Sequence, residues 1–148
     1  MSNRQQLCFE EETQAAFAFL EESFGFTRTL VSVRKVRYES ERAYIEINHG
    51  DYDFEVAIAF GRLRRSEPEQ FDFTLFLRIV NPSLEKAFGE RIADKPDNVR
   101  ETIQKLASAL RSEGMDIIKA NDSVFDRMKT VTWWQFRPDA AKGGGGRS

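Results

Sequence analysis

Residues 43–49 (AYIEINH), 54–60 (FEVAIAF) and 71–79 (FDFTLFLRI) decide the fold, because each places apolar side chains at every second position. The side chains of a β-strand point alternately to the two faces of its sheet, so each stretch predicts a strand with one apolar and one mostly polar face. Consecutive antiparallel strands joined by short connections usually lie side by side. The three stretches therefore predict an antiparallel sheet with one covered and one open face.

The neighbouring residues complete this sheet and supply helices to cover it. We expect four strands, the first of them bent near Arg34, over residues 29–39, 42–48, 53–61 and 71–80. Apolar residues at helical spacing predict helices over residues 9–24, 83–88 and 96–113, and from Asn121 or Asp122 onward. Gly25 and Gly114 stand where helices of this kind end.

These elements predict an α+β fold: a four-stranded antiparallel meander with an N-terminal helix and two to three C-terminal helices on one face. The apolar face of the sheet is the only large surface against which the helices can bury their apolar sides. We expect residues 1–137 to form a single α+β domain and residues 138–148, which are rich in glycine, to form a flexible tail.

Composition is typical of a globular protein, since 41% of the 148 residues are hydrophobic and 31% are charged. A net charge of −2 gives no support to nucleic-acid binding by charge alone. No apolar stretch approaches the ~18 residues that a membrane-spanning helix needs, and no secretion signal is recognisable. We therefore expect a soluble protein of the cytoplasm, without a membrane span.

Sequence motifs for catalysis or cofactor binding are lacking. The chain has one cysteine and one histidine, His49, and it contains no glycine-rich phosphate loop, nucleophile elbow or HExxH motif. We predict no catalytic residue, no cofactor and no metal site.

The polar face of the predicted sheet is the main candidate for function. Its parity predicts two aromatic rings and an arginine beside a strip of alanine, which suits either a solvated surface or a surface for a partner. In a meander, Tyr44, Phe76 and Arg78 should lie within reach of one another. The predicted partner-binding residues are Tyr44, Glu46, Glu55, Phe76 and Arg78, with Arg62 and Arg64 from the adjoining loop.

One resemblance supports a binding role. The segments that carry it are Phe17-Ala18-Phe19-Leu20, Gly25-Phe26, Val36-x-Tyr38-x-Ser40, Ile45-x-Ile47 and Phe60-Gly61-Arg62-Leu63. This pattern, over about the first 65 residues, resembles small uncharacterised bacterial α+β proteins of the immunity or antitoxin type. The resemblance implies neutralisation of a toxin by direct binding, and it implies no catalytic residues.

We therefore predict a non-enzymatic protein-binding factor, of the immunity or antitoxin type, that binds another protein or a second copy of itself through the open face. One alternative is a small hydrolase or ligand-binding enzyme that uses carboxylates near the Asn48–Asp53 hairpin, where His49, Asp51 and Asp53 come together. Another is a sheet-based nucleic-acid binder that uses the Arg62–Arg65 loop and Arg78.

Overall fold

Five antiparallel strands in consecutive order form the sheet of the computed structural model, which describes residues 7–50, 52–88 and 92–135. The strands are β1 (Thr27–Ser32), β2 (Lys35–Glu39), β3 (Ala43–His49), β4 (Val56–Arg62) and β5 (Phe71–Asp72). Two helices precede them, α1 (Phe9–Ala16) and α2 (Ala18–Phe24). Five follow, α3 (Phe73–Val80), α4 (Pro82–Phe88), α5 (Pro96–Glu113), α6 (Met115–Ile118) and α7 (Asp122–Gln135). The predicted α+β class and meander are confirmed, whereas the predicted tail and Asp51 lie outside the described residues.

The core lies between the apolar face of the sheet and the helices. Ile45 pairs with Phe60 and Ile47 with Ile58 in the β3–β4 ladder, and all four side chains are buried. The Phe60 ring is 6.2 Å from that of Phe76 on α3 and 5.8 Å from that of Phe125 on α7. Phe60 therefore packs two of the helices that follow the sheet, α3 and α7, against one face of it.

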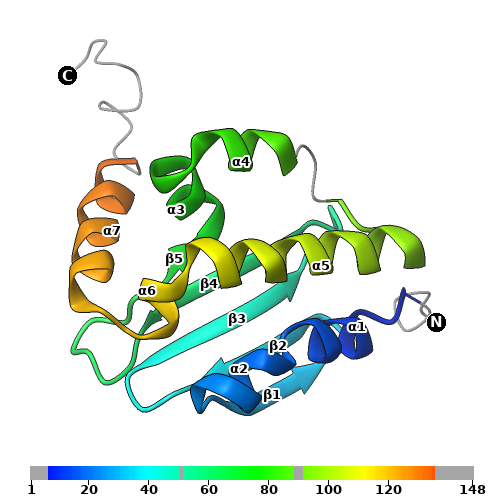
Figure 1. Cartoon of the computed structure of the whole chain (residues 1–148), viewed down its shortest axis with the longest axis horizontal. Coiled ribbons are helices and arrows are strands. Elements are labelled where there is room, and N and C mark those ends of the chain that lie inside the picture. The colour runs from blue at the N-terminus through cyan, green and yellow to red at the C-terminus, as the bar shows by residue number, and fades with distance from the viewer. Residues whose placement is uncertain (1–6, 51, 89–91, 136–148) are drawn as a thin grey trace.

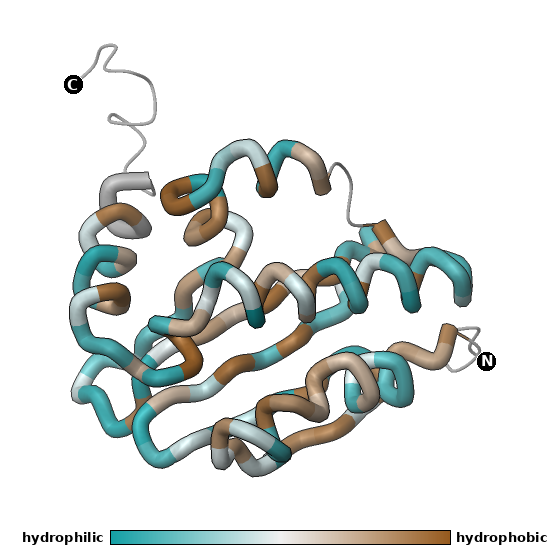
Figure 2. Tube along the Cα trace, in the orientation of Figure 1, coloured by the Kyte–Doolittle hydropathy of each residue, from teal (hydrophilic) through white to brown (hydrophobic). Residues whose placement is uncertain are grey.

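The N-terminal helices share this face. The Phe9 ring of α1 stacks on that of His49, at the end of β3, with centroids 5.1 Å apart. In Figure 1, α1 and α2 lie in front of β1 and β2, while α5 crosses in front of β4. Hydrophobic and hydrophilic residues alternate along β3 in Figure 2, but six of its seven residues are buried, Tyr44 and Glu46 on the face opposite the helices among them.

The predicted first strand, residues 29–39, is wrong as a single strand. It is a hairpin of β1 and β2, with Val31 opposite Val36 and Ser32 opposite Lys35. The predicted bend near Arg34 is the turn itself, and the bulge lies instead between Arg28 and Leu30. The two-residue turn explains why the predicted strand looked bent: the paired residues Val31 and Val36 lie on the same face of the sheet although one has an odd and the other an even number.

The predicted fourth strand, residues 71–80, is also wrong beyond Asp72. Only Phe71 and Asp72 pair with β4, and Phe73 begins the helix α3. Phe73, Phe76 and Leu77 are buried at helical spacing. Six of the eight residues of α3 are apolar, so the segment fits the apolar spacing of a strand as well as that of a helix. Periodicity alone therefore does not distinguish a buried helix from a strand here.

The remaining helices agree with their patterns. α5 begins at Pro96 and ends before Gly114, and its apolar residues at helical spacing are buried, namely Val99, Ile103, Leu106, Ala107 and Leu110. The predicted helix over residues 9–24 breaks at Phe17, where α1 ends and α2 begins, and Gly25 has the expected left-handed backbone. Among the helices described, none combines the length and apolarity that crossing a membrane requires.

Candidate functional site

The face of the sheet opposite the helices, here called the open face, is organised in rows across the strands. Register places Leu30, Arg37, Glu46, Ala59 and Asp72 side by side, one from each strand. Two flanking rows run through Glu39, Tyr44 and Gly61, and through Lys35, Asn48 and Ala57. Charged and aromatic residues therefore occupy β2 and β3, while small residues occupy β4.

Arg37 is the centre of the open face. Its guanidinium donates hydrogen bonds to Glu39 at 2.8 Å and Glu46 at 3.2 Å, and it lies 4.0 Å from the centroid of the Tyr44 ring. Burial opposes the charge, but the hydrogen bonds to the two carboxylates outweigh it and raise the pKa of the Arg37 guanidinium. Lys35 adds a second cation 3.8 Å from Glu46. This network holds the charged groups of the open face in place.

Tyr44 extends across Gly61 toward the loop after β4. Its hydroxyl donates a hydrogen bond of 2.6 Å to the backbone carbonyl of Glu69, and burial raises the pKa of the Tyr44 phenol to about 12, so the donor stays protonated at neutral pH. A Cβ at Gly61 would collide with the Glu69 carbonyl and lie 2.9 Å from the Tyr44 ring. Glycine is therefore required for this crossing.

Arg62, a predicted partner-binding residue, is instead part of the structural framework. Its guanidinium binds Glu69 at 2.6 and 2.9 Å, Asp122 at 3.2 Å and Asp126 at 3.0 Å. The hydrogen bonds to Glu69 raise the pKa of the Arg62 guanidinium above its ordinary value despite burial. Burial alone would raise the pKa of the Glu69 carboxyl, but the hydrogen bonds from Arg62 outweigh it and lower that pKa. Arg62 thus joins β4, the following loop and α7.

The structure does not bring Phe76 and Arg78 to Tyr44 as predicted. Phe76 lies on α3 and is buried in the core, stacked on Phe73 with ring centroids 5.6 Å apart. Arg78 is exposed near the end of α3, 3.5 Å from Glu85 of α4. A strand over residues 71–80 would place both side chains on the open face, and the prediction is wrong because residues 73–80 form the helix α3.

Two further predicted residues lie at the margins. Glu55 precedes β4, is half-buried and forms an isolated antiparallel β-bridge with Ile92. Arg64 is exposed in the loop after β4 and donates a hydrogen bond to the backbone carbonyl of Glu41. Of the seven predicted residues, Tyr44 and Glu46 are the two that this face brings together, and both are largely buried there, at 6% and 9% exposure.

The hairpin proposed for hydrolysis places its histidine inward. His49 is 2% exposed, and its Nε2 lies 2.8 Å from the carbonyl oxygen of Ala93. Asp53 accepts a hydrogen bond of 3.0 Å from the backbone of Glu55, as a turn residue does. In residues 7–50, 52–88 and 92–135, no group of three or more His, Cys, Asp or Glu side chains is arranged to hold a metal ion.

The arginine loop proposed for nucleic acid has mixed charge. Arg64 and Arg65 line a small polar hollow of about 240 Å³ together with Lys129 of α7, but Glu67 and Glu69 line it as well. Arg62 is not available to bind a nucleic-acid phosphate, because its guanidinium is already paired with three carboxylates.

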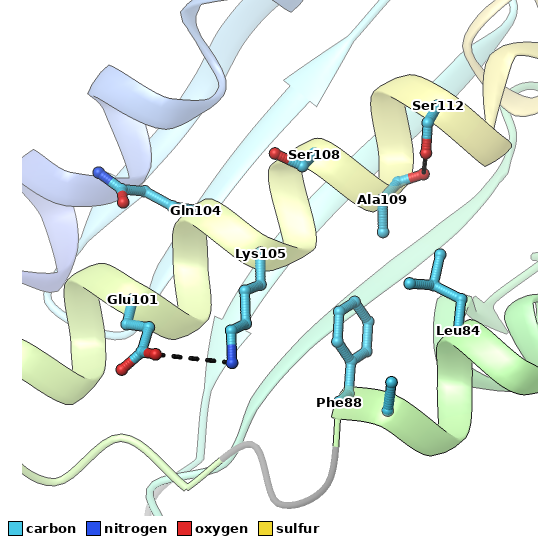
Figure 3. A pocket seen from close by; sticks show the side chains of 9 residues that line it. Leu84, Phe88, Glu101, Gln104, Lys105, Ser108, Ala109 and Ser112 are labelled. Atoms are coloured by element: carbon cyan, nitrogen blue, oxygen red, sulfur yellow. Dashed lines mark hydrogen bonds and ion pairs between the residues drawn. The ribbon is translucent and has the colours of Figure 1, made fainter.

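A larger groove lies between α4 and α5 on the helical side of the molecule. Its volume is about 520 Å³, and its walls include Leu84 and Phe88 of α4 and Lys105 and Ala109 of α5 (Figure 3). The sequence patterns gave no sign of this groove, because it depends on how far apart two helices pack.

Arg37, Lys35 and Glu39 are open-face residues that sequence reasoning missed. The signal was present, since residues 35–39 (KVRYE) alternate charged and apolar side chains.

Comparison with protein-family models, with curated proteins and with solved structures found no match to this chain.

Proposed function

We propose that this protein is a non-catalytic binding factor that recognises another protein through the open face. The observation that carries the proposal is the fixed group of Arg37, Tyr44 and Glu46 beside the small residues of β4. Arginine and tyrosine are enriched in protein interfaces, and side chains already held by ion pairs lose little further entropy on binding.

The shape and charge of the open face support a protein partner. The half-buried Ala57 has a short side chain that allows a partner to approach the sheet closely, and the exposed Leu30 adds an apolar contact at the edge of the central row. Lys35 and Arg37 are balanced by Glu39, Glu46 and Asp72, so the surface suits a partner of mixed charge.

The test is a bulky substitution that leaves the ion pairs intact. Ala57→Arg places a long charged side chain on the half-buried strip of the open face, whereas Ala15→Arg makes the same change at an exposed position of α1, on the helical side. We expect both variants to melt like the wild type. Only Ala57→Arg should lose the partner in affinity capture from the native host, or the dimer in sedimentation.

The immunity or antitoxin type is the finer form of the proposal, and it rests on the resemblance of residues 17–63. The captured protein should then stop growth when expressed alone and should be harmless when expressed with this chain. Loss of protection with Ala57→Arg but not with Ala15→Arg would tie neutralisation to the open face. Equal capture and equal protection by the two variants would refute the role of this surface.

A further inference from the structure

The apolar side of α4 packs against the margin of the core and also lines the groove introduced above. None of the residues of α4 is fully buried, and Leu84 and Phe88 are half-buried. Figure 3 shows Ala109 of α5 pointing toward them, and Lys105 of the same helix with its ammonium beside Glu101. The resulting space of about 520 Å³ lies within the range of about 300–1,000 Å³ of small-molecule sites.

Polarity changes along this groove. One end carries Lys105, whose ammonium lies 3.6 Å from the carboxylate of Glu101. At the other end Leu84 lies opposite Ala109, with Ser112 as a neutral polar residue of the lining (Figure 3). Both members of the ion pair are more than half exposed, at 53% and 66%, so their interaction is weak and Lys105 can exchange Glu101 for another anion at little cost.

We propose that the groove between α4 and α5 binds an amphipathic carboxylate of the size of a medium-chain fatty acid. The carboxylate pairs with the Lys105 ammonium, and the chain lies between Leu84, Phe88 and Ala109. This arrangement buries apolar surface at one end and satisfies a charge at the other.

The volume of the groove and the lysine at one end favour a small anionic molecule. α4 has seven residues and is about 10 Å long, which limits the length of chain that the groove can cover. Lys105 should attract an anionic head group and Glu101 should repel it, so the affinity for such a ligand should depend on both side chains.

Decanoate and decanol are the probes, because they share an apolar chain and differ in the charge of the head group. Binding to the full chain is measured by calorimetry and by amide chemical shifts, below the concentration at which decanoate forms micelles. We expect decanoate to bind more tightly than decanol and to shift the amides of α4 and α5.

Two substitutions of opposite sign test the role of the charge. Lys105→Met should weaken decanoate binding about tenfold, the worth of one charge-assisted hydrogen bond, and should leave decanol unchanged. Glu101→Gln should tighten decanoate binding, because it removes the competitor for Lys105. Lys86→Met is the matched control, since Lys86 is an exposed lysine of α4 that does not line the groove.

Ala87→Trp tests the location. Ala87 is exposed and lines the groove, so the larger ring should block both probes while the thermal melt stays unchanged. Absence of decanoate binding, equal affinity for decanol and decanoate, or equal effects of Lys105→Met and Lys86→Met would each overturn the proposal.

Discussion

At the level of one residue, Arg62 shows that an ion pair contributes differently to stability when it is buried and when it is exposed. The Arg62 and Glu69 side chains are only 5% and 6% exposed, whereas Arg42 and Asp122, 3.3 Å apart, are 58% and 59% exposed. Removing one partner of a buried pair leaves the other as an uncompensated buried charge, and an exposed pair carries no such penalty.

Arg62→Met should therefore lower the free energy of unfolding by about 3–5 kcal/mol, measured by urea denaturation at neutral pH. Arg42→Met is the matched control, because Arg42 also contacts Asp122, and its loss should cost less than about 1 kcal/mol. Similar losses in the two variants would contradict the structural role assigned to Arg62.

The same pair predicts a dependence on pH. The pKa of Glu69 in the folded protein lies below its ordinary value of 4.5, so the pair stabilises the fold fully above that pH and loses its contribution as the pH falls through the folded-state pKa. In Arg62→Met, a protonated Glu69 is the easier group to bury. The stability gap between wild type and Arg62→Met should narrow as the pH falls below 4.5, while the gap for Arg42→Met stays small throughout. Parallel curves for wild type and Arg62→Met would contradict this coupling.

At the level of elements, α3 decides which residues face the open face and which face the core. As a helix, residues 73–80 bury Phe76 against Phe60 and leave Arg78 exposed. As a strand, the same residues would place both side chains on the open face.

Phe76→Ala should cost about 3–5 kcal/mol of unfolding free energy, as is usual when a buried phenylalanine is removed. Arg78→Ala should change stability by less than about 0.5 kcal/mol, because its side chain is exposed near the helix end. Urea denaturation of the two variants distinguishes the conformations, since a strand would make both substitutions mild.

At the level of the whole molecule, helices from both ends of the chain cover a single face of the sheet. Ile58 lies on the covered face and is 1% exposed, while its neighbour Ala57 lies on the open face and is half-buried. One strand therefore carries a core position and a surface position side by side.

Ile58→Asp should prevent folding, because an unpaired carboxylate in the core costs several kcal/mol. Ala57→Asp, one residue away, should leave a cooperative thermal melt close to that of the wild type. A melt for Ile58→Asp that matches the Ala57→Asp control would refute the one-sided arrangement of the helices.

The sequence by itself determined those elements in which polar residues separate the apolar ones at the regular spacing of a strand or a helix. Alternation along β3 and β4, the apolar side of α5 and the glycines at positions 25 and 114 were all sufficient, because each is a local signal. Only the tertiary structure decided the conformation of residues 73–80, where few polar residues mark a period and contact with Phe60 selects a helix. It also decided the role of Arg62, whose partners Asp122 and Asp126 lie 60 and 64 positions away along the chain, a distance over which no local pattern carries information.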